Sequence, residues 1–197
     1  STNKRLRDET EMDESFEYAL DFYKDYDRDG QTLSARISYE ESEDDGLEDI
    51  EDFATFPSIS ETIFEKVSNI DFQKRLLGQV DFIYPIDKET EFEFGYRGSF
   101  LERETDYDVS FLTGNSFISD SGLSNVFNYK ESVNSLYSQF GKKFDKLSAL
   151  FGLRYENSKQ EINQKTTNQF EIKKYSDLFP TLNLAYEFSS QESLTFG

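Results

Sequence analysis

Apolar and polar residues alternate along four pairs of segments in this chain, and the two segments of each pair meet at a turn of a few residues. The turns lie near residues 27–30, 85–88, 142–145 and 189–192. Because successive side chains point to opposite faces of a β-strand, each segment would have one apolar and one polar face. The pattern therefore predicts four antiparallel hairpins, at about residues 15–42, 67–104, 125–160 and 176–197.

The stretches between these hairpins are polar, and we expect them to form long loops near residues 42–66, 104–126 and 157–175. Residues 1–14 are charged and are predicted to be a lead-in to a partial barrel domain over residues 15–197. Short turns at one end of the strands and long loops at the other are typical of outer-membrane barrels. The predicted fold is all-β, an antiparallel up-and-down meander of long hairpins that forms part of a transmembrane β-barrel.

The composition excludes membrane-spanning helices and is compatible with a transmembrane β-barrel. The chain has 36% hydrophobic residues and a net charge of −19, with no cysteine and no histidine. No stretch approaches the roughly 20 apolar residues of a membrane-spanning helix. A transmembrane strand needs only about 9 to 11 residues, half of them facing the lumen, so low mean hydropathy does not exclude a barrel.

The alternation assigns each side chain of a barrel wall to lipid or to lumen. The positions expected toward lipid are Val80, Phe82, Tyr84, Phe92, Phe94, Leu153, Leu182 and Leu184. The polar positions between them are expected toward the lumen, where they are the candidate ligand-binding residues: Gln79, Asp81, Glu91, Glu93, Arg97, Arg154 and Glu156.

Four segments of the chain are similar to a known family. In order, 79–85, 94–98, 152–156 and 178–186 resemble the barrel domain of TonB-dependent outer-membrane receptors. The resemblance implies a complete barrel of about 22 strands, of which this chain would supply about eight. It also implies that the protein lies in the bacterial outer membrane, in contact with its lipid. The further partners that it implies are a plug domain, a TonB complex that supplies energy, and a small nutrient ligand such as a metal chelate or an oligosaccharide. The charged start shows no secretory signal or plug, and the last residues read as a strand, so we expect a portion of a longer protein.

Two acidic segments are candidates for cation binding. Asp25, Asp27 and Asp29 match the opening of a calcium loop, but its twelfth position is Arg36 where a glutamate would be needed. A hairpin turn with Gly30 at positive φ accounts for the same residues, and we predict no metal site there. Residues 40–52 contain no basic residue and are predicted to be a solvated loop, which could gather divalent cations.

Catalysis finds little support in this sequence. Without cysteine or histidine the chain lacks thiol nucleophiles, imidazole bases and the usual zinc ligands, so we predict no enzyme and no cofactor. Its negative charge would repel nucleic acid. The alternative to a receptor barrel is a soluble antiparallel β-sheet module for ligand binding or adhesion, with an acidic surface that could bind calcium.

Overall fold

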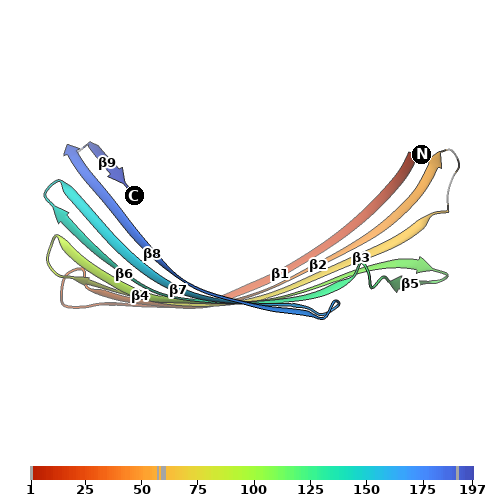
Figure 1. The fold of residues 1–197 in the computed structure, drawn as a ribbon, viewed down its shortest axis with the longest axis horizontal. Helices are drawn as coiled ribbons and strands as arrows, with labels where there is room; N and C mark the ends of the chain where they lie inside the picture. The colour runs from red at the N-terminus through yellow and green to blue at the C-terminus, as the bar shows by residue number, and fades with distance from the viewer. Residues whose placement is uncertain (1, 57, 59–60, 190) are drawn as a thin grey trace.

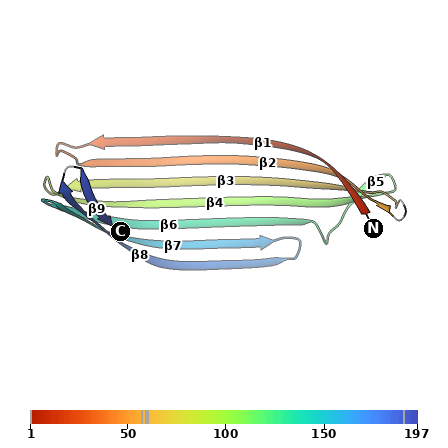
Figure 2. The ribbon, with the colours of Figure 1, turned by 90° about the horizontal axis from the view of Figure 1, so that it is seen from above.

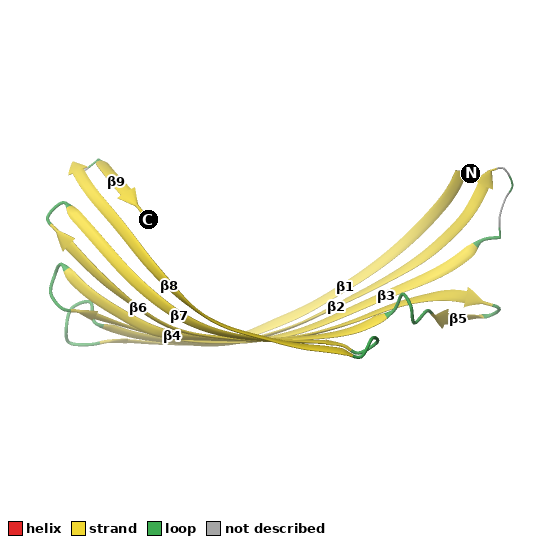
Figure 3. Ribbon diagram, in the orientation of Figure 1, coloured by secondary structure: helices red, strands yellow, loops and turns green. Residues whose placement is uncertain are grey.

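The computed structural model describes residues 2–56, 58, 61–189 and 191–197, and all of its regular structure is β-strand (Figure 3). Its strands are β1 (Thr2–Asp25), β2 (Thr32–Phe56), β3 (Ile63–Pro85), β4 (Thr90–Thr113), β5 (Ser116–Ser119), β6 (Asn125–Phe144), β7 (Leu147–Gln164), β8 (Gln169–Ser189) and β9 (Glu192–Phe196). Within the described ranges, no helix has the length and apolar character needed to cross a membrane.

The strands form one antiparallel sheet in the order β1-β2-β3-β4-β6-β7-β8-β9, while the short β5 pairs with β4 outside this path. Each long strand therefore lies beside its neighbour in sequence, from β1 to β8 (Figure 2), and the pairing order puts β1 and β9 at the two edges. The sheet curves and twists, so that β1 rises at one end and β8 at the other (Figure 1). This geometry confirms the predicted all-β meander and is typical of a segment of a barrel with tilted strands.

The strands extend further than the sequence pattern indicated. The predicted lead-in belongs to β1 from Thr2 onward, and the acidic residues 40–52 lie in β2, paired with both β1 and β3. The predicted loops at 104–126 and 157–175 are also largely strand, with connections only at 114–115, 120–124 and 165–168. Most side chains on both faces of these extensions are polar, with exceptions such as Ile50 and Val109, and this hides the alternation, but the backbone of each strand still pairs with its neighbour.

The tight turns lie close to where the pattern placed them. They connect the strands at residues 26–31, 86–89 and 145–146, and Ser189 pairs with Glu192 across the last turn. Parts of the predicted lead-in, first loop and last turn, at residues 1, 57, 59–60 and 190, lie outside the described residues. All four turns are at the same end of the sheet, which we call the turn end.

Continuous register keeps the two faces of the sheet separate. One row across the strands joins Val80, Tyr96, Leu136, Tyr155 and Leu178, each paired with the next. From β2 to β7 no register shift interrupts the ladders, so the alternation in sequence becomes one apolar face and one polar face.

Very few apolar side chains are buried within the sheet itself. The described core consists of Ile50, Val67 and Val109, with Phe111 packed against it, all on the polar face away from the turn end. In contrast, the large side chains of the apolar face are exposed, as for Leu136, which is 61% exposed. An apolar surface of this extent requires a covering phase or partner.

Candidate functional site

The apolar face forms a belt of limited height, which ends well before the strands do. On β4 it extends from Phe92 to Phe100 and on β7 from Leu147 to Tyr155, nine residues in each case. At about 3.3 Å per residue this is roughly 26 Å along the strand, and about 20 Å along the axis of a barrel whose strands tilt by about 40°. The lipid-facing band of outer-membrane barrels is about 25 Å tall, so the belt is somewhat shorter than this band but comparable to it.

Aromatic rings gather near the turn end of this belt. Phe82 lies 5.3 Å from Phe94 and 6.4 Å from Tyr84 between ring centroids, and Tyr186 lies 5.0 Å from Phe188. Tyrosines such as Tyr84 and Tyr186 prefer the boundary between lipid tails and headgroups, because the ring is apolar and the hydroxyl is polar. The belt therefore has an aromatic border on the turn side.

The polar face carries a connected group of side chains opposite the belt. The Tyr137 hydroxyl donates to Asp81, and Gln79 Nε2 donates to Asp81 Oδ2 at 2.9 Å. Gly95 provides the space for the ring, because a Cβ at this position would lie 2.5 Å from Tyr137 Cζ. Register thus brings three strands into contact here, with the tyrosine ring lying against the backbone of β4.

A second group lies beside the first on the same face. Arg154 donates from Nε to Glu156 at 3.0 Å and from a terminal nitrogen to Ser135 Oγ at 2.9 Å, and Ser135 is fully buried. Arg97 pairs in register with Gln79 and with Ser135, and its exposed guanidinium makes no ion pair with any described residue. An uncompensated cation next to a paired one can attract anionic groups of a ligand.

The predicted lumen-facing residues share this face, in two places. Gln79, Arg97 and Arg154 line a groove of about 440 Å³, which also includes Tyr137 and Phe179. Asp81 and Glu156 are hydrogen-bonded to residues of this groove. The sequence did not single out Tyr137 or Phe179, because their strands become neighbours of the others only through pairing in register.

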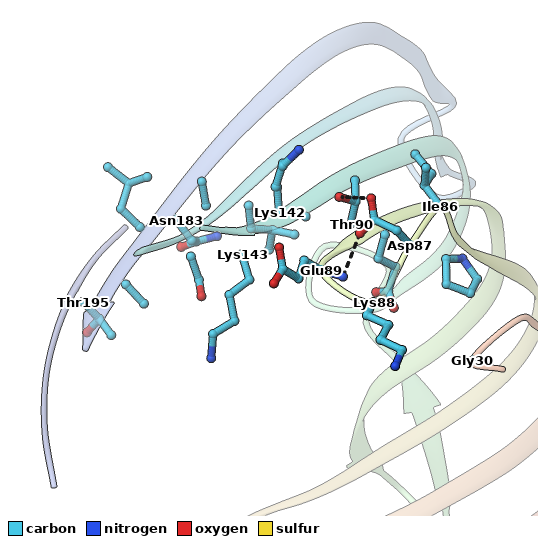
Figure 4. Close-up of a pocket in the computed structure, with 18 of the residues that line it drawn as sticks. Gly30, Ile86, Asp87, Lys88, Glu89, Thr90, Lys142, Lys143, Asn183 and Thr195 are labelled. Atoms are coloured by element: carbon cyan, nitrogen blue, oxygen red, sulfur yellow. Dashed lines mark hydrogen bonds between the residues drawn. The ribbon is translucent and has the colours of Figure 1, made fainter. Parts of the chain in front are cut away.

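The remaining two predicted residues lie nearer the turn end. Glu91 lines a separate cavity of about 1010 Å³ between the turns. Glu93 lies two residues further along β4 and pairs with Gln139 of β6. Figure 4 shows that Lys142 and Lys143, which both line this cavity, extend to opposite sides of the ribbon. This difference follows from the alternation of side chains along β6.

The candidate calcium loop is a hairpin turn. Gly30 has φ 77°, as predicted, and Tyr26 N donates to Gln31 O at 3.0 Å. Arg28 donates to Pro85 O at 2.8 Å, which attaches this turn to the next one. Within the described part of the chain, no group of three or more histidine, cysteine, aspartate or glutamate residues could hold a metal ion.

Beyond the belt, the strands continue as a polar extension. Asp71 accepts two hydrogen bonds from Arg103, and this carboxylate raises the pKa of the guanidinium. Burial and a 2.9 Å hydrogen bond to Glu131 raise the pKa of Tyr129 to about 12. The extension therefore has its own side-chain network outside the height of a bilayer.

Comparison with known proteins gives a family and a fold. The sequence model of the outer membrane protein β-barrel family matches residues 24–197. No curated protein matches the chain.

Among solved structures, the ferric preacinetobactin receptor BauA from Acinetobacter baumannii is similar, with a TM-score of 0.52 and 13% identity over 90% of this chain and 29% of its own. The RagAB peptide transporter has a TM-score of 0.51 and 16% identity over 90% of this chain and 20% of its own. The copper transporter OprC has a TM-score of 0.50 and 11% identity over 89% of this chain and 28% of its own. This chain thus spans less than a third of each of these structures. The comparisons confirm the outer-membrane β-barrel family and a fold like that of a barrel segment in these structures.

Proposed function

The chain belongs to the outer membrane protein β-barrel family, whose place is the bacterial outer membrane, and from this premise we propose that it forms part of the wall of a TonB-dependent receptor that imports a nutrient. In this proposal the apolar belt contacts lipid, the polar face lines the lumen, and the turn end lies on the periplasmic side. Its role is binding and gated passage of cargo, without covalent chemistry.

One observation supports the proposal most strongly: the exposed apolar belt is comparable in height to the lipid-facing band of outer-membrane barrels and lies opposite a hydrogen-bonded polar face. The alternative of a soluble β-sheet module would leave rings such as Phe94, which is 49% exposed, in contact with water. Long strands that continue past the belt agree with a barrel wall that extends outside the membrane.

The proposed cargo is a small nutrient such as a metal chelate or an oligosaccharide. The similar structures are described as transporting or receiving a ferric chelate, peptides and copper, so this fold accepts several classes of cargo. Support for a charged or polar cargo comes from Arg97 and Arg154 beside the ring of Phe179 in one groove. A plug domain and the TonB complex are the further partners of this proposal.

Uptake by cells that produce the complete protein tests the function. Labelled ferric chelates, copper and oligosaccharides would be supplied to cells with the gene, without it, and with the gene but without TonB. We expect uptake of one cargo class to require both the gene and TonB. An Arg154→Gln variant should reach the membrane normally and take up less of that cargo. Uptake that is independent of TonB, or a complete protein that stays monodisperse without detergent, would contradict the proposal.

A further inference from the structure

Unpaired basic side chains are concentrated at the turn end of the sheet. Among the described residues, those at this end that make no ion pair are Lys24, Arg28, Lys88, Lys142 and Lys146. Such a concentration is unexpected in a chain with 40 acidic residues and a net charge of −19.

The opposite end of the apolar face is different. There Lys130 pairs with Glu102 at 2.8 Å and Lys159 pairs with Glu161 on the same face, whereas Lys4 and Lys174 make no ion pair with a described residue. The turn side therefore presents the larger group of unpaired cations next to the belt.

Three of these cations lie over aromatic rings at the border of the belt. Lys24 follows Phe22 on the apolar face of β1, and Lys142 follows Phe140 on the same face of β6. The cation-to-centroid distances are 4.6 Å for Lys24 over Tyr26, 4.7 Å for Arg28 over Tyr84 and 5.1 Å for Lys142 over Phe144. We call Lys24, Arg28 and Lys142 the cationic rim.

Contacts between successive turns make the rim continuous. Arg28 donates to Pro85 O at 2.8 Å, and Lys143 N donates to Glu89 O at 2.8 Å, so the first three turns lie side by side. A cation held over a ring at a membrane border has an apolar support below it and its charge toward the headgroups. The rim thus presents three positive charges along the turn-side border of the belt.

Carboxylates lie near the rim, with Asp25, Asp27 and Asp29 beside Lys24 and Arg28 in the sequence, but none of the described carboxylates forms an ion pair with a rim cation. Asp87 accepts hydrogen bonds from Glu89 N at 2.8 Å and from the Thr90 hydroxyl at 3.1 Å, and these donors lower the pKa of Asp87. Lys142 also lowers that pKa through its charge, but the two side chains make no ion pair. Lys143, on the other side of the ribbon from Lys142 (Figure 4), pairs with Glu187 at 3.5 Å. The charge of the rim is therefore left for an anion outside the protein.

We propose that the cationic rim binds the phosphate of anionic phospholipids in the leaflet on the turn side of the membrane. The inference rests on the proposed function in one respect, namely that the belt lies in a bilayer. The positive charge of the rim is complementary to a phosphodiester headgroup, and its rings would lie against the first carbons of the lipid tails. A basic residue near an anionic lipid surface contributes about fivefold in affinity, so three correspond to roughly 100-fold.

The test uses the complete protein, purified in mild detergent and exchanged with an equimolar mixture of phosphatidylglycerol and phosphatidylethanolamine. Native mass spectrometry then gives the ratio of the two lipids that remain bound. The variant combines Lys24→Gln, Arg28→Gln and Lys142→Gln, which removes the charge but keeps polar side chains of similar length. The matched control is Lys143→Gln, one residue from Lys142 on the opposite face.

We expect the unmodified protein and the Lys143→Gln control to retain phosphatidylglycerol preferentially, and the triple variant to lose most of a roughly 100-fold preference. No preference in the unmodified protein, or an equal loss in the control, would overturn the inference. Heat-dependent mobility on gels separates this failure from that of the proposed function. A protein that assembles as a barrel but shows no preference for anionic headgroups refutes lipid binding by the rim alone. A protein that does not assemble in membranes refutes both this inference and the proposed function.

Discussion

Replacing Phe94 by arginine tests which face of the sheet contacts lipid. The Phe94 ring lies within the belt of β4, 5.3 Å from Phe82 and 6.0 Å from Phe92 between centroids. Losing two such contacts costs about 0.5–1.5 kcal/mol each. A charge on the lipid face costs about 2–4 kcal/mol at the midplane and about 0–1 kcal/mol near the interface, so at Phe94, between the two, we take about 1–3 kcal/mol. We therefore expect Phe94→Arg to lower the free energy of unfolding in a membrane by about 2–6 kcal/mol.

The assay is refolding of the complete protein into phospholipid vesicles across a denaturant series, with the folded fraction followed by heat-dependent gel mobility. Phe94→Ala removes the ring contacts without adding charge, so the difference between the two variants gives the cost of the charge. Arg97→Gln is the control, since Arg97 lies on the opposite face and makes no ion pair with a described residue. Equal losses in Phe94→Arg and Arg97→Gln would refute the assignment of the faces, as would a stable Phe94→Arg protein.

Two further substitutions test the polar face in the same refolding assay. Gly95→Ala should destabilise the barrel by about 1–3 kcal/mol, because the new Cβ displaces the Tyr137 ring, while Gly78→Ala, with no atom within 4 Å, should cost far less. The pKa of Tyr129 is raised to about 12 from an ordinary 10.0, so Tyr129 ionises at a lower pH in the unfolded chain than in the folded one. The stability that this residue contributes is therefore complete below pH 10 and is lost as the pH approaches 12. Tyr129→Phe should flatten that loss of stability with rising pH. Tyrosinate absorbance follows the ionisation itself, and an unchanged slope of stability against pH in the variant would contradict the assigned environment.

The candidate site was only partly accessible from the sequence. Alternation placed Gln79, Asp81 and Arg97 on one face, and the structure agrees, because their strands contain no register shift. Whether that face lines a lumen stays a prediction for the variants above to test. The contact of Tyr137 with Asp81 joins residues 56 positions apart, and no local pattern indicates that they meet.

The acidic residues 40–52 show where the pattern failed. Like charges such as Asp13 and Asp44, or Glu14 and Glu43, are direct partners across β1 and β2. Such pairs are unfavourable, and a charged run without alternation is typical of a loop. The ladder of backbone hydrogen bonds nevertheless continues through them, because each strand has a neighbour on which it can extend.

The sequence by itself determined the two faces, the tight turns and the family, since side-chain alternation and turn chemistry are local properties of the chain. Gly30 illustrates this, as its positive φ follows from its place in a short hairpin turn. Only the tertiary structure decided where the strands end and which side chains meet, as in the groove of Arg97 and Arg154 and in the cationic rim. The physical reason is that strand length and register depend on backbone pairing between segments far apart in the chain, and this pairing leaves no periodic signal in either segment alone.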